Sequence, residues 1–273
     1  MSAQVGKQVG KLKVVLGCVA LACAASCSPA QEAARVVLPV AVDSAGVVPV
    51  TTDLGYTVTL SEARVALGGV VFTIAGEAHV ASAWEVPSLG ELLIPSAQAH
   101  PGHYQGGEVT GELPGSFVID WAADDGRALG DATLLAGRYT AANFTFERAA
   151  QGALPAGDAL IGHTAALAGT ASRDGRQVRF TILVDAPEGR VLVGAPFEAT
   201  LGASSAGTIG LRFTPHDELE GDTLFDEVDF FALDADGDDV LRIEPGDSEV
   251  EGAYNTLRRA LMTHDQYAVH LLS

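Results

Sequence analysis

Basic residues are scarce in this chain, which has 16 lysines and arginines against 35 aspartates and glutamates, and a formal net charge of -19. Nucleic acid is therefore disfavoured as a partner, because so few cations cannot neutralise a phosphate backbone. An anionic membrane surface is an equally poor electrostatic partner. Apolar residues nevertheless make up 48% of the chain, so we expect a folded protein with a hydrophobic core and not a disordered acidic chain.

Cysteine and lysine are confined to the start of the chain. The three cysteines are Cys18, Cys23 and Cys27, and the three lysines occupy positions 7, 11 and 13. The lysines precede an apolar run over residues 14–25, which is shorter than the roughly 20 apolar residues of a transmembrane helix and typical of a signal peptide. The absence of thiols after residue 27 excludes cysteine catalysis and cysteine-ligated zinc from the rest of the chain.

The small residues Ala24, Ala25 and Ser26 directly precede Cys27 and resemble the lipobox of bacterial lipoproteins. The resemblance implies that Cys27 is lipidated and becomes the mature N-terminus, with Cys23 as the alternative site. It also implies an exported protein whose lipid anchors it to the cell envelope, most often in the outer membrane, facing the periplasm or the surface. An ordinary secretory signal or an uncleaved anchor is the other interpretation.

Short segments in which apolar and polar residues alternate dominate residues 54–215. The clearest of them cover 56–60, 65–74 with a break at Gly68 and Gly69, 117–121, 139–146, 178–185 and 208–214. Turn signals such as Asp174–Gly175 separate them. This pattern predicts a mainly β fold, an antiparallel β-sandwich or barrel over residues 51–215. We expect a signal segment over 1–27 and a tether over 28–50 before it.

The composition changes after Pro215. Fifteen acidic residues and a single basic one, Arg242, lie between residues 216 and 251. Ser248 and Glu251 have the spacing of a capping box, and apolar residues at helical spacing follow up to Met262. We therefore expect residues 216–273 to form an acidic, mainly helical C-terminal segment.

Histidines are the first candidate metal ligands. His100 and His103 flank a Pro–Gly pair, and a turn there would bring both imidazoles to one side. Neutral imidazole is the commonest protein metal ligand, and tetrahedral zinc needs two further ligands, for which we consider His79 and His163. Without cysteine, and with Met262 as the only methionine after the leader, zinc or copper(II) is favoured over copper(I). The alternative is an ordinary surface loop.

Alternating aspartates form a second candidate metal site. Asp234, Asp236 and Asp238 precede Val240, and the pattern resembles the calcium loop of EF-hand and dockerin-like proteins. The resemblance makes the three aspartates the first, third and fifth ligands and the Val240 carbonyl the seventh. Hard cations require several oxygen ligands, and a tight turn with alternating aspartates supplies them.

This loop departs from the calcium pattern at two positions. Asp239 stands where glycine is expected, and Pro245 stands where the bidentate glutamate belongs, so Glu244 is one residue short of that position. An acidic solvated turn is the alternative interpretation. We favour calcium, because carboxylates this close repel one another unless a cation neutralises them.

Enzyme motifs are absent: the chain contains no GxSxG, P-loop, GxGxxG or HExxH sequence. We therefore expect a non-enzymatic, lipid-anchored protein that binds zinc or copper(II) through loop histidines and calcium through the acidic loop. One alternative is a structural or adhesive envelope lipoprotein that binds a protein or a glycan, for which an exposed apolar patch would be evidence. Another is a glycoside or other hydrolase, which needs paired carboxylates in a deep pocket.

Overall fold

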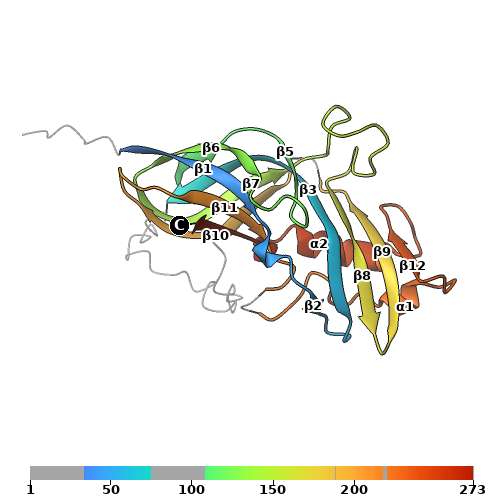
Figure 1. The fold of residues 1–273 in the computed structure, drawn as a ribbon. Coiled ribbons are helices and arrows are strands. Elements are labelled where there is room, and N and C mark those ends of the chain that lie inside the picture. Colours follow the sequence, from blue (N-terminus) through green and yellow to red (C-terminus); the bar gives the residue numbers. More distant parts are fainter. Residues whose placement is uncertain (1–33, 75–107, 188, 218–219, 273) are drawn as a thin grey trace, which may run out of the picture. The chain divides into compact units, whose positions relative to one another are not determined.

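The computed structural model describes residues 34–74, 108–187, 189–217 and 220–272 (Figure 1). The chain divides into two units, 1–32 and 33–273, and every described residue belongs to the second unit. The expected signal segment with Cys23 and Cys27, and the candidate ligands His79, His100 and His103, therefore lie outside the described residues. Among the described residues, no helix has the length and apolar character needed to cross a membrane.

The described part of the chain is mainly β, which confirms the predicted fold class. Its strands are β1 (Arg35–Asp43), β2 (Val50–Thr51), β3 (Thr57–Ile74), β4 (Glu108–Leu113), β5 (Phe117–Asp120), β6 (Ala128–Leu135), β7 (Gly137–Phe146), β8 (Ala165–Arg173), β9 (Arg176–Val184), β10 (Val191–Leu201), β11 (Thr208–Phe213), β12 (Val240–Ile243) and β13 (Tyr267–Leu272). The helices are α1 (Phe230–Leu233) and α2 (Glu251–Leu261), with 3-10 turns η1 (Ser44–Gly46) and η2 (His264–Gln266).

Strand β3 organises the sheet, because its 18 residues serve two sets of partners. Its first half pairs with β8, from which the order continues to β9 and β12. Its second half pairs with β4 on one side and β7 on the other. From β4 the order runs through β6, β1 and β11 to β13, and β13 contacts β10, the partner of β7. The sheet therefore curls around its main hydrophobic core (Figure 1).

Most strand pairs are antiparallel, as predicted, but β1 pairs with β11 and β9 with β12 in parallel. Strand β1 lies within the range expected to be a tether, and its alternating burial explains its place in the sheet. The C-terminal segment contributes β12 and β13 to the same sheet, in addition to the helices expected there. Buried residues alternate in both strands, as Leu241 with Ile243 and Tyr267 with Val269 show.

The pair Gly68 and Gly69 lies inside β3 and does not interrupt it. The pairing with β7 shifts register between Leu67 and Val70, which identifies a β-bulge at the two glycines. A Cβ atom on Gly68 would lie 2.8 Å from a carboxylate oxygen of Glu147, so the Glu147 side chain would have to shift to admit a larger residue. The bulge bends β3 at the point where its partners change.

Helix α2 begins at Glu251 and buries Tyr254, Leu257 and Leu261, as its apolar spacing predicts. The predicted capping box is wrong, because the N-cap residue is Val250 and no side chain caps the helix. The turn before the helix is closed differently, by the carboxylate of Asp247, which accepts the Glu249 N–H at 2.9 Å.

Tyr267 on β13 lies within an aromatic cluster in the core. Its ring packs edge-on against Phe144, with ring centroids 5.0 Å apart, and also contacts Trp121 and Phe213. Its hydroxyl is buried and has no hydrogen-bond partner among the residues that the structure describes. Burial raises the pKa of Tyr267 far above that of a free tyrosine. The buried hydroxyl therefore destabilises the folded state, because burial deprives it of hydrogen bonds to water.

We expect Tyr267→Phe to raise the free energy of unfolding by up to about 1 kcal/mol, because it removes the unpaired hydroxyl and keeps the ring. For a domain of this size that is roughly 2–4 °C in melting temperature. Tyr139→Phe is the control, because the hydroxyl of buried Tyr139 donates to the Leu135 carbonyl at 2.7 Å, and its loss should destabilise. Equal destabilisation of the two variants in thermal unfolding would contradict this account.

Candidate metal site

The acidic loop Asp234–Asp239 joins α1 to β12. Helix α1 is a single turn whose first N–H groups are capped by Asp229, which accepts the Ala232 N–H at 3.2 Å. The loop turns at Gly237 and Asp239, with φ angles of 73° and 60°. Asp239 thus adopts the left-handed conformation that glycine supplies in the calcium pattern, and aspartate is one of the residues that tolerates it. The departure from glycine does not prevent the turn.

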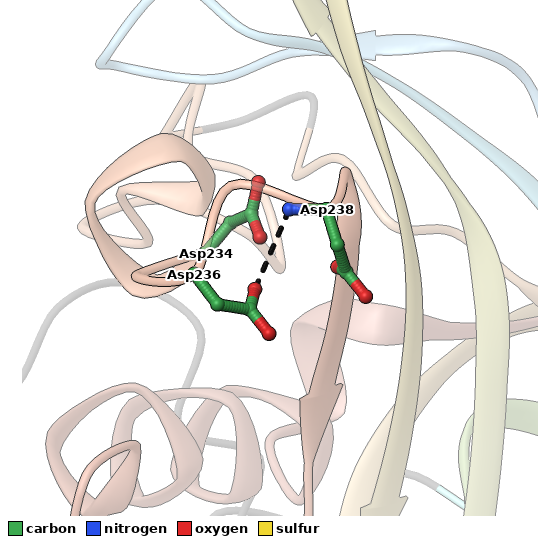
Figure 2. A group of neighbouring side chains, drawn as sticks. All are labelled: Asp234, Asp236 and Asp238. Atoms are coloured by element: carbon green, nitrogen blue, oxygen red, sulfur yellow. Dashed lines mark hydrogen bonds between the residues drawn. The ribbon is translucent and has the colours of Figure 1, made fainter.

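Asp234, Asp236 and Asp238 come together on this loop (Figure 2). One carboxylate oxygen from each lies within 4.8 Å of those from the other two. Hydrogen bonds order the turn: the Asp238 N–H donates to Asp236 at 3.4 Å, and the Val240 N–H donates to Asp238 at 2.9 Å. The described ranges contain no other such group of three possible metal ligands.

The side chain of Asp234 is completely buried, whereas Asp236 and Asp238 are exposed. Its Oδ2 accepts hydrogen bonds from the Arg176 guanidinium and from the Asp239 N–H, the latter at 3.2 Å. Its Oδ1 has no hydrogen-bond partner among the described residues. A buried carboxylate oxygen without a partner is costly, and a bound cation is one of the few groups that would compensate it.

Charge also accumulates at this loop. Arg176 bonds to Asp239 as well, at 3.0 Å, and is the only cation with an ion pair to the loop in the described part of the chain. One positive charge thus faces the four carboxylates of residues 234, 236, 238 and 239, which leaves an excess of negative charge at the loop. Oxygen ligands of this kind suit calcium or magnesium better than zinc or copper.

Glu244 is not part of the converging group. Val240 begins β12, an extended strand that pairs with β9, and Glu244 follows the end of that strand. At about 3.3 Å per residue, it lies on the order of 13 Å from Val240 along the chain. The Val240 carbonyl stays a predicted ligand, since its residue adjoins the three aspartates. The protein ligands in the loop are therefore fewer than in an EF-hand.

His163 is the one predicted histidine ligand that the structure describes. It precedes β8, and its Nδ1 lies 2.8 Å from the Asp185 carboxylate, which is also 3.5 Å from Arg148. A carboxylate on one ring nitrogen orients the imidazole and leaves Nε2 as the atom that would ligate a metal. The convergence of His163 with His79, His100 and His103 stays a prediction, because those three lie outside the described residues.

Two residues beside the acidic loop were not identified from the sequence. The first is Arg176, which lies 58 positions from Asp234 along the chain. The second is Asp229, whose carboxylate accepts the Tyr56 O–H at 2.5 Å. This hydrogen bond, more than any other contact, lowers the pKa of Asp229. The turn signal Asp174–Gly175 could have placed Arg176 at the tip of a hairpin. No local sequence pattern identifies Asp234 as the partner of Arg176.

Comparison with protein-family models, with curated proteins and with solved structures found no match to this chain. The function of the acidic loop is therefore argued from its own geometry and chemistry.

The Tyr56–Asp229 hydrogen bond should make stability depend on pH. A lowered carboxyl pKa in the folded state stabilises the protein above the unfolded value of 3.8, and this contribution is lost as the pH falls through the folded value. Tyr56→Phe should cost about 1.5–3 kcal/mol at pH 7 and flatten the acid side of the stability profile. Tyr139→Phe is the control, because its hydroxyl bonds to carbonyls. Denaturant unfolding from pH 7 to 3 measures this, and parallel profiles for wild type and Tyr56→Phe would contradict it.

Proposed function

We propose that this chain is an exported, lipid-anchored, non-enzymatic envelope protein that binds calcium at the acidic loop Asp234–Asp239. The observation that carries the proposal is the convergence of three carboxylates, of which the buried one retains an oxygen without a hydrogen-bond partner. The lipobox-like segment ending at Cys27 supports export. The bound ion would be structural, a staple between the C-terminal segment and the sheet.

The position of the loop supports a stapling role. Among the described strands, β12, which follows the loop, ends the sheet and pairs only with β9, over four residues. Before the loop, Phe230 of α1 packs against Phe180 of β9, with ring centroids 5.2 Å apart. An ion in the loop would tie the end of α1 to the start of β12 and so hold both against β9.

Export and a small ligand set both favour calcium over other ions. Extracellular calcium modules bind with dissociation constants of about 10⁻⁴–10⁻³ M, since calcium outside the cell is plentiful. Three carboxylates, a carbonyl and water molecules suit that range. An ion that binds only the folded state raises the free energy of unfolding by RT ln(1 + [L]/Kd). Calcium binding and stabilisation of the fold are therefore expected together.

Calcium titration of the full chain, purified in detergent and stripped with chelator, tests the proposal. We expect heat of binding at submillimolar to millimolar calcium and a rise of a few degrees in melting temperature at 10 mM. Asp236→Asn with Asp238→Asn should abolish both, and because these side chains are exposed the double variant should still fold.

Asp247→Asn is the matched control. Asp247 also accepts a hydrogen bond from the N–H two residues ahead, at 2.9 Å, but it lies outside the converging group. It should bind calcium like the wild type. Calcium binding that survives in the Asp236/Asp238 double variant would reject the site.

A transition-metal site at the loop histidines is a second candidate function. The observation that favours it is the Asp185 carboxylate on Nδ1 of His163, an arrangement common among zinc-binding histidines. With His79, His100 and His103, the site would supply four neutral imidazoles, a set that suits zinc or copper(II).

Zinc and copper(II) titrations of the same full chain check the second candidate. We expect stoichiometric binding that falls at least 100-fold in a His100→Ala, His103→Ala variant, because two of four ligands are lost. His264→Ala is the control, since this residue belongs to η2 and not to the predicted ligand set. Binding that is unchanged in the double variant would leave residues 100 and 103 as an ordinary loop.

A further inference from the structure

Arg176 occupies a fixed place beside the acidic loop. It lies at the tip of the β8–β9 hairpin, opposite Arg173. The tip residues Asp174 and Gly175 have φ angles of 52° and 82°, as in the type I′ turn that joins two strands tightly. The turn therefore presents both arginines from the tip of the hairpin, and the backbone position of Arg176 is set by strand pairing.

The guanidinium of Arg176 is held from three directions. It donates to Oδ2 of Asp234, it donates to Asp239 at 3.0 Å, and it lies 4.5 Å from the centre of the Phe231 ring. Two carboxylates and an aromatic face form a good environment for a planar cation. Arg176 thus places a positive charge on the one carboxylate of the converging group that is completely buried.

We propose that Arg176 is the built-in counter-ion of the calcium site and sets its affinity, because calcium has to compete with the guanidinium for Asp234. This inference rests on the proposed calcium function. It follows from charge: a divalent ion bound to Asp234 lies next to a guanidinium that already bonds to the same carboxylate, and the two cations repel each other. Asp239 and Phe231 can still hold the guanidinium when a metal ion takes Asp234.

A purely structural role for Arg176 makes the opposite prediction. If the arginine only holds Asp234 in place, its removal should loosen the loop and weaken calcium binding. If it competes, its removal should strengthen calcium binding while it weakens the metal-free protein, because buried Asp234 then loses its partner. The sign of the change in calcium affinity therefore separates the two roles.

Calorimetric calcium titration of Arg176→Gln, in the full chain in detergent, is the test. We expect calcium affinity to rise about ten-fold or more, and the calcium-induced rise in melting temperature to exceed that of the wild type. Arg176→Lys keeps the positive charge but lacks the guanidinium fork that spans two carboxylates. Its calcium affinity should therefore lie between those of the wild type and Arg176→Gln. This second variant keeps a cation on Asp234 and serves if Arg176→Gln does not fold.

Arg173→Gln is the matched control. Arg173 lies on the same hairpin tip and over the same Phe231 ring, at 5.1 Å, but its hydrogen bond goes to the Leu54 carbonyl, at 2.9 Å. Its loss should change calcium affinity less than three-fold. A similar gain in calcium affinity in Arg173→Gln would show a general effect of removing positive charge and overturn the specific role of Arg176.

The outcomes for the inference and for the proposed function differ. Equal or weaker binding in Arg176→Gln, with binding in the wild type, overturns the inference and leaves the calcium function intact. Binding in Arg176→Gln alone supports the inference and shows that the arginine suppresses the site. Binding in neither protein, nor in Arg176→Lys, overturns both.

Discussion

The double pairing of β3 is the constraint on which the rest of the structure depends. A strand of 18 residues can serve two sets of partners only if it bends, and the bulge at Gly68–Gly69 supplies the bend. Residues before the bulge pair with β8, which carries the β8–β9 hairpin with Arg173 and Arg176 at its tip. The acidic loop lies against that tip, so the geometry of the candidate site follows from pairing within the sheet.

Arginine is the counter-ion for several buried or half-buried carboxylates of this acidic chain. Asp43 is bonded through both oxygens, one to the Ala45 N–H and the other to Arg212. Asp158 likewise uses both oxygens, with Arg64 bonding to each of them. Asp234 departs from this pattern, because only its Oδ2 is bonded and its Oδ1 has no hydrogen-bond partner among the described residues. That difference distinguishes the acidic loop from an ordinary buried ion pair.

Local patterns in the sequence were sufficient for the fold class and for the aspartates of the loop. Alternation predicted β5, β7, β9 and β11 to within a few residues, and helical spacing predicted α2. Alternating aspartates on a tight turn converge because the turn itself brings them together, which needs no distant contact.

The remaining features depend on contacts between distant parts of the chain. The burial of Asp234 and its bond to Arg176 arise only when the hairpin and the C-terminal segment meet. The short strand β12 forms because β9 offers it an edge, and its four residues are too few to stand out in a sequence. The hydrogen bond from Tyr56 to Asp229 spans 173 positions and likewise has no local signal.

The site also lies at the end of the sheet, beside β12, and the unpaired backbone groups of an edge strand favour pairing with other chains. A short strand next to a negatively charged loop is a common protection against such pairing. A cation in the loop would reduce that charge while it holds β12 against β9. Arg176 performs both tasks in part, since it reduces the charge and links β9 to the loop, but it leaves one buried oxygen and three negative charges uncompensated. The loop thus lacks both positive charge and a partner for the buried oxygen of Asp234. A divalent ion such as calcium, which is coordinated by oxygen atoms, would supply both.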